Sequence, residues 1–158
     1  MQTVQNITLL LKKKQDLFLE FEHYTNLLTT CDINDMTNYI TKRSNLANEI
    51  ENVTDKIINL ARTVTVSPSV EAILANNCAY AEVPFEWQPV FLEAQKLSGI
   101  IVRCVEVNEQ ALRRMADMRS HLKERITQTK NTPRIIKYLT SSGAIQQERS
   151  ISIKNRKI

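Results

Sequence analysis

The stretch LLLKKKQDLFLEFEHYTNLLTTCDINDMTNYI (residues 9–40) decides the fold. It contains no glycine or proline, and its apolar residues recur at steps of three and four, which is typical of amphipathic helices. The pattern breaks just before Asp32, which is placed to cap a second helix, and Asp35 falls in the favourable first turn of that helix. Because so few residues separate the two runs, they predict an antiparallel helical hairpin.

Apolar runs of this kind occur three times, over roughly residues 4–28, 33–65 and 88–128. The second run repeats every seven residues, with Arg43 as its one polar break, and such repeats favour left-handed coiled packing. The third run predicts a helix of about 40 residues, or about 60 Å, whereas the first two are nearer 40–50 Å. We therefore expect the third helix to extend two or three turns beyond the hairpin.

The segment between the second and third runs changes character and contains most of the prolines. Ser67-Pro68 has the pattern of an N-cap and first helical position, which predicts a short helix over residues 69–76. Phe85 and Trp87 are expected to pin the rest of the crossing onto the core. Binding of a partner through Trp87 is the alternative, although buried aromatic residues commonly serve packing.

These patterns together predict an all-α protein. We expect an elongated antiparallel three-helix bundle or coiled coil, with a short extra helix between the second and third helices. Pro133 breaks the helical pattern, so the bundle is assigned to residues 1–132 and a basic, flexible C-terminal tail to residues 133–158. The chain has only 2 glycines, which argues against the Gly-rich loops that hold phosphate groups.

Charge is unevenly distributed along the chain, whose formal net charge is +4. Nine basic and two acidic residues lie from Lys123 onward, so this stretch carries +7 and the remainder −3. A basic tail can contact nucleic acid or an anionic membrane. The other interpretation is a solvated tail that keeps the protein in solution, and this one is preferred because net charge alone says little about partners.

Three cysteines are present, at long spacings and without a CxxC motif. An odd number in this arrangement predicts neither a disulfide framework nor a zinc site, and free thiols fit a reducing cytoplasm. The N-terminal residues lack the order of charges and apolar residues found in secretory signals, and no stretch has the apolar length of a membrane span. We expect a cytoplasmic protein without membrane insertion.

Catalytic and metal-binding patterns are also missing from the sequence. The only histidines, His23 and His121, lie in different runs among charged neighbours, and no special turn presents a nucleophile. The nearest approaches to a metal site are Glu20, Glu22 and His23 in the first run and Glu106 and Glu109 in the third, and we interpret both as ordinary solvated faces. The sequence therefore predicts a protein that is not an enzyme and that needs no cofactor or metal.

Asn108 is the one polar residue in the otherwise apolar seam of the third run. A polar residue at such a position can fix the register of packed helices at a cost in stability, or it can anchor the backbone of a partner. Downstream, Met115 and Met118 suit either a plain core or an adaptable binding surface. Both interpretations stay open for each of these residues.

The order of these parts resembles the FlgN-type flagellar export chaperones. The resemblance rests on the hairpin over residues 9–50, on VEVNEQALRRM (residues 105–115) and on a short tail that begins at Tyr138 and Gly143. In the second motif, Asn108 and Leu112 match the Asn and Leu of the family pattern. Most of the chain is covered, and the motifs are degenerate.

The resemblance implies a cytoplasmic chaperone without ATPase activity that guards hook-filament junction proteins before secretion. Its cargo would be the helical terminal segment of such a hook-associated protein, which it would later pass to the export apparatus. An amphipathic cargo helix would lay its apolar stripe along the third helix. The implied partner-binding residues are Ile101, Val105, Asn108, Leu112, Met115, Leu122, Ile126, Tyr138 and Leu139.

Two other functions remain as alternatives. One is a helical protein that binds nucleic acid through the residues from Lys123 onward, with an affinity that falls steeply with salt. The other is a structural coiled-coil subunit whose exposed seam is covered by self-association. Of the partners considered, nucleic acid is the less favoured one.

Overall fold

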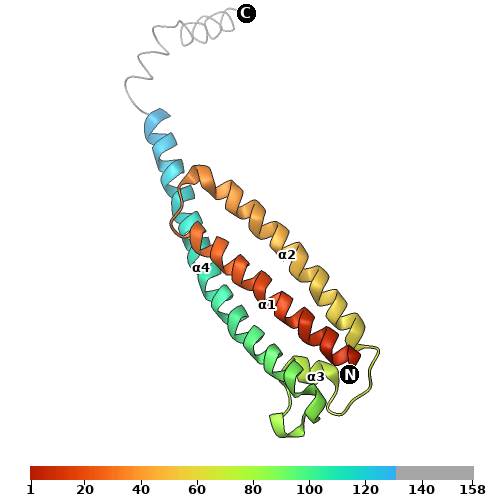
Figure 1. Cartoon of the computed structure of the whole chain (residues 1–158). Coiled ribbons are helices and arrows are strands. Elements are labelled where there is room, and N and C mark those ends of the chain that lie inside the picture. Colours follow the sequence, from red (N-terminus) through yellow and green to blue (C-terminus); the bar gives the residue numbers. More distant parts are fainter. Residues whose placement is uncertain (131–158) are drawn as a thin grey trace, which may run out of the picture. The chain divides into compact units, whose positions relative to one another are not determined.

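The structure is a computed structural model that describes residues 1–130. All regular secondary structure in this range is helical, which confirms the predicted all-α class (Figure 1). The helices are α1 (Gln2–Leu28), α2 (Ile33–Ala61), α3 (Val70–Leu74) and α4 (Gln88–Lys130), with two 3-10 turns, η1 (Tyr80–Glu82) and η2 (Phe85–Trp87), before α4. Contacts divide the chain into a compact unit of residues 1–113 and a second unit that begins at Arg114. The expected tail, residues 133–158, lies outside the described residues.

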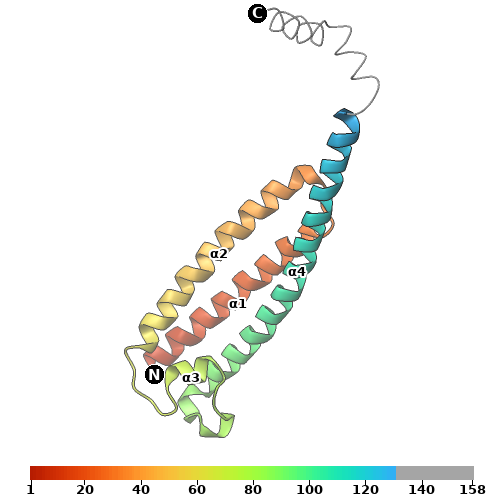
Figure 2. The same cartoon turned by 180° about the vertical axis from the view of Figure 1, so that it is seen from behind.

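Helices α1 and α2 pack against each other as the hairpin that the sequence predicts. Near the turn, the rings of Tyr24 and Tyr39 lie with their centroids 6.1 Å apart. At the other end of the hairpin, Leu10 of α1 and Leu60 of α2 line one pocket. These two pairs show that the helices run in opposite directions, and Figures 1 and 2 show them side by side.

The start of α2 follows the sequence signals. Asp32 occupies the N-cap position with extended backbone angles (φ −72°, ψ 157°), and Asp35 lies in the first turn. The Asp32 carboxylate makes no capping hydrogen bond, although its carbonyl oxygen accepts one from the Asp35 amide at 3.1 Å. The predicted position is therefore confirmed, while the favourable contribution comes from negative charge near the helix N-terminus.

The prediction for the cap of the short helix was wrong by two residues. Ser69, rather than Ser67, is the N-cap of α3, and its Oγ accepts a hydrogen bond from the Ala72 amide at 3.2 Å. Two serines two residues apart offer the same capping group, so the sequence pattern alone does not separate them. The helix ends before Asn76, whose φ of 54° is left-handed and whose side chain donates to the Phe91 carbonyl at 3.1 Å.

The first part of α4, up to residue 113, packs along α1. Gln15 Nε2 donates to the carbonyl oxygen of Glu93 at 3.0 Å and to its carboxylate at 2.8 Å. Further along both helices, Cys104 Sγ donates to the Phe18 carbonyl at 3.4 Å. Because the contacts advance together along the two helices, α1 and this part of α4 run in the same direction.

An apolar core joins α1, α2, α3 and the first part of α4. It includes Ile7, Leu11, Leu17, Leu46, Val53, Ile57, Val70, Ile73, Val90, Phe91, Ala94 and Leu97. Trp87 is buried in it, which agrees with a packing role, but the expectation that Phe85 also pins the crossing was wrong, since Phe85 is exposed. The two residues lie two apart in a 3-10 turn of three residues per turn, so their side chains leave the turn in different directions.

Candidate partner-binding surface

The polar interruptions of the two apolar seams meet in the structure. Arg43 of α2 donates from Nη2 to Asn108 Oδ1 of α4 at a distance of 2.6 Å. Both side chains are half-buried. Asn108 thus has an internal hydrogen-bond partner, which agrees with the interpretation that this residue fixes the register of packed helices.

The guanidinium of Arg43 lies in a largely apolar setting. Its central carbon lies 4.5 Å from the ring centroid of Phe21, a distance at which a cation is attracted to the ring face. Its Nε is buried and has no hydrogen-bond partner among residues 1–130. Burial lowers the pKa of Arg43 because desolvation disfavours the charged form, yet the pKa of a guanidinium is high enough for it to stay charged.

Beyond Ile101, the buried row of α4 runs one residue before the row that the sequence pattern indicates. Cys104 is 4% exposed and Ala111 is 0% exposed, whereas Val105 and Leu112 are each 53% exposed. Cys104 faces α1, where its Sγ donates to the Phe18 carbonyl. The larger side chains of Val105 and Leu112 lie partly in solvent.

Val102, Val105 and Leu112 form the α4 apolar row, an exposed set within the first unit. Their spacings of three and seven residues place them on one side of a helix. Glu109 lies in the same row, between Val105 and Leu112, and its carboxylate is 3.6 Å from Arg113. Beside the row, Arg103 bonds Glu22 of α1 at 3.3 Å. A row of apolar side chains with charged neighbours is the arrangement that an amphipathic partner helix can use.

The residues assigned to partner binding from the sequence have different environments in the structure. In residues 1–113, Val105 and Leu112 are exposed, Asn108 bonds Arg43, and Ile101 packs against the core. In the second unit, Met115 is half-buried, and Leu122 and Ile126 are exposed. Tyr138 and Leu139 lie outside the described residues.

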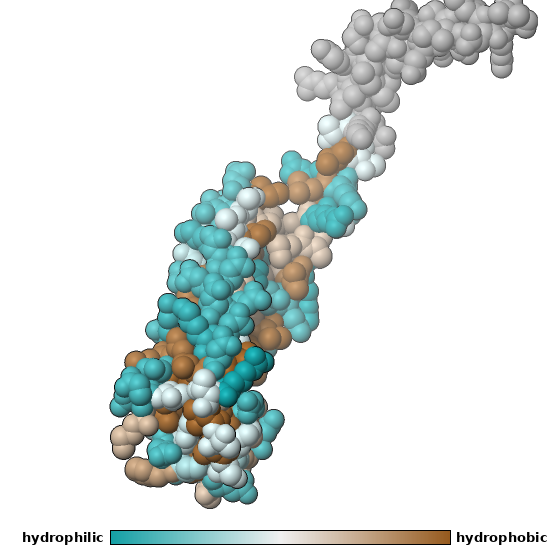
Figure 3. Space-filling view, turned by 90° about the vertical axis from the view of Figure 1, so that its right-hand side faces the viewer, coloured by the Kyte–Doolittle hydropathy of each residue, from teal (hydrophilic) through white to brown (hydrophobic). Residues whose placement is uncertain are grey.

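Sequence reasoning missed Val102, which is 58% exposed and belongs to the α4 apolar row. The signal that could have found it is its place three residues before Val105, on the same side of the helix. On the face shown in Figure 3, hydrophobic surface lies in separate patches among hydrophilic side chains.

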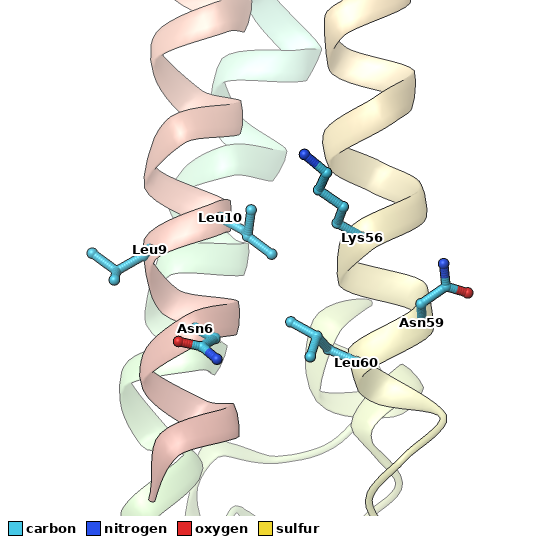
Figure 4. Close-up of a pocket in the computed structure, with 6 residues that line it drawn as sticks. All are labelled: Asn6, Leu9, Leu10, Lys56, Asn59 and Leu60. Atoms are coloured by element: carbon cyan, nitrogen blue, oxygen red, sulfur yellow. The ribbon is translucent and has the colours of Figure 1, made fainter.

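The sequence also gave no indication of an open pocket of about 500 Å³ between α1 and α2. Leu10 and Leu60 point toward each other across it, Lys56 reaches into it, and Leu9 points away from α2 (Figure 4). Leu10 and Leu60 each belong to the apolar seam of their own helix, and the pattern within one helix does not report the distance to the other. Lys56 is the titratable residue of the pocket lining, which otherwise consists of leucines and asparagines.

The described residues contain no cluster of His, Cys, Asp and Glu that could hold a metal ion. His23 contacts the ring of Tyr24 edge-on, with centroids 5.3 Å apart, and His121 lies 3.8 Å from the Glu124 carboxylate. Cys78 and Cys104 are free thiols. Burial raises the pKa of Cys104, and the nearby Glu22 carboxylate raises it further. The thiolate form of Cys104 is therefore less populated.

Comparisons with models of known protein families, with characterised proteins and with solved structures find no match to this chain. In the range from residue 1 to residue 130, no helix combines the length and the apolar character needed to cross a membrane.

Proposed function

We propose that this protein is a cytoplasmic export chaperone of the FlgN type and that it binds a helical terminal segment of hook-associated proteins through α4. It would prevent their premature assembly and deliver them to the export apparatus, as a binding protein rather than an enzyme. Helices α1 and α2 and the first part of α4 would form a three-helix bundle in which α2 runs antiparallel to the other two. The observation that carries the proposal is the exposure of the α4 apolar row, at Val102, Val105 and Leu112.

The energetics of such a complex indicate how much surface is needed. Fully burying one Val or Leu side chain contributes about 1.5–3 kcal/mol, and association costs at least about 4 kcal/mol in lost freedom of motion. Because the three residues of the row are already partly covered, they would not support tight binding alone. We expect Leu122 and Ile126, exposed in the second unit, to contribute further apolar contacts.

The two roles considered for Asn108 lead to different binding behaviour. Its oxygen already accepts from Arg43, so the proposal assigns it to the register of α2 and α4 rather than to the cargo backbone. Specificity for the cargo would then come from the spacing of apolar side chains. Reversible release is compatible with this arrangement, because a partner held mainly by partly exposed side chains exchanges readily.

The test uses synthetic peptides from the terminal segments of hook-filament junction proteins of the same organism. Calorimetry should give a one-to-one complex that persists at moderate salt. Leu112→Asp should weaken binding at least tenfold without loss of helical circular dichroism, because it places a charge in the apolar contact. Leu9→Asp, on an exposed apolar residue of α1, is the matched control and should bind normally. Unchanged binding by Leu112→Asp would refute the proposed surface.

Self-association is the second candidate, and the same exposed row favours it. A second copy could cover Val105 and Leu112 by pairing α4 with α4. Sedimentation of the protein alone separates the two functions. A stable dimer that Leu112→Asp converts to a monomer would favour the structural coiled coil over the chaperone.

A further inference from the structure

A separate pocket, of about 320 Å³, lies among α1, α2, the α3 region and the first part of α4. Its apolar lining includes Leu11, Ile57, Leu74 and Leu97, and its charged lining residues are Lys14 and Glu71. Small-molecule sites are usually concave and mostly apolar, with a few polar groups that orient the ligand, and their volumes begin near this size. The pocket belongs entirely to the first unit and is distinct from the α4 apolar row.

Lys14 is the unusual member of this lining. Its side chain is half-buried, and no carboxylate within residues 1–130 lies within 4.0 Å of its ammonium group. Desolvation lowers the pKa of Lys14, as expected for a cation that has lost water without gaining a partner. Such a charge is stabilised when an anion reaches it.

The other polar lining residues limit which anion fits. Thr54 already donates its hydroxyl proton to the Ile50 carbonyl at 2.7 Å, so Lys14 is the free cationic donor of the pocket. Glu71 is exposed, and its carboxylate would repel a second negative charge on a ligand. A ligand with one negative charge and an apolar body satisfies both conditions.

We infer that this pocket binds a small monocarboxylate with an apolar chain. The carboxylate lies on the Lys14 ammonium, and the chain lies against Leu11, Ile57 and Leu97. Affinity then rises with chain length until the pocket is filled. The transfer free energy of one methylene corresponds to about fourfold in affinity, so hexanoate should bind more tightly than butanoate by about an order of magnitude.

The experiment titrates the full chain, labelled at its methyl groups, with octanoate and follows the methyl resonances. Saturable shifts are expected at Leu11, Ile57 and Leu74, while Leu112 stays unchanged. Octylamine, which has the same chain and the opposite charge, should give no saturable shift at these methyl groups. This comparison needs no variant and therefore does not depend on whether a substituted protein folds.

Two substitutions then test the role of the charge. Lys14→Met removes the ammonium group but keeps an unbranched apolar side chain, and it should weaken octanoate binding at least tenfold. Lys13→Met, at an exposed neighbour, should bind normally. The inference is overturned if octanoate gives no saturable shift at the pocket methyl groups. It is also overturned if octylamine binds as well as octanoate, or if Lys14→Met retains the affinity of the unmodified protein.

Discussion

Arg43 and Asn108 are 65 positions apart in the sequence, and a hydrogen bond of 2.6 Å joins Nη2 of the first to Oδ1 of the second. The bond connects α2 to α4 at the two polar residues that interrupt the apolar seams of these helices. Its partners are only half-buried, so water shares in their solvation. Such a pair adds less to stability than to the choice of one helix register.

Replacing one partner should therefore cost more than replacing both. Asn108→Leu leaves the half-buried guanidinium without its acceptor and should lower the free energy of unfolding by about 1–2 kcal/mol. The double variant Arg43→Met with Asn108→Leu should recover most of that loss, because no desolvated charge remains. Urea denaturation of the two single variants and the double variant measures the coupling. Strictly additive effects would show that the two side chains do not interact.

The register of α4 gives a second prediction. Ala111 has no exposed surface, so Ala111→Leu should overpack the core and destabilise the protein by about 1–3 kcal/mol. Leu112→Ala, one residue later on an exposed position, should change stability by no more than about 0.5 kcal/mol. Thermal unfolding of the two variants tests which residue is buried. If Leu112 were buried instead of Ala111, as the sequence pattern indicates, Leu112→Ala would be the more destabilising change.

Thiol reactivity gives an independent check of the same register. Cys104 is buried and burial raises its pKa, whereas Cys31 and Cys78 are half-buried. Iodoacetamide should therefore label Cys104 last in the folded protein, since the thiolate is the reactive species. Mass spectrometry after timed labelling measures the order, and labelling in urea should remove the difference. Early labelling of Cys104 would place it on the surface.

Lys14 gives a prediction about pH. Its pKa is lowered in the folded protein, so the folded state binds fewer protons than the unfolded chain between the folded pKa and the ordinary lysine pKa of about 10.4. Below that window the charged lysine opposes folding, and stability recovers as pH rises through it. Lys14→Met should therefore be more stable than the natural protein at pH 7, with an advantage that shrinks toward pH 10. Denaturant unfolding at both pH values measures this, and an advantage that grows with pH would contradict it.

Much of the fold could be predicted from the sequence because each helix is encoded locally. The hairpin follows from the period of apolar residues and from Asp32 at the start of α2, and the structure agrees with both. The exact cap of α3 did not follow, since Ser67 and Ser69 offer the same group to the backbone. The exposure of Phe85 depends on how the 3-10 turn η2 directs its side chain, and the spacing of apolar residues does not indicate this.

The candidate surface was predicted only in part. Apolar spacing predicted a seam along α4, but Cys104 and Ala111 fit its seven-residue period as well as Val105 and Leu112 do. Which pair is buried depends on how closely the neighbouring helices approach, and this is a property of the packed unit. The hydrogen bond between Asn108 and Arg43 could not be predicted either, because it joins residues from the seams of two different helices.

The pairing of α1 with α4 has a consequence for how the chain acquires its structure. Hydrogen bonds between these helices join residues 78 to 86 positions apart, whereas Tyr24 and Tyr39 meet across a short turn. Closing the longer loop costs about 1.5 kcal/mol more by the logarithmic dependence on length. We expect the hairpin to form on the ribosome before residues 88–113 are synthesised, and pulse-labelled amide exchange during refolding should protect α1 and α2 first. Until the first part of α4 packs against α1, the nascent hairpin exposes an apolar face. Cellular holdase chaperones would bind that face in competition with α4.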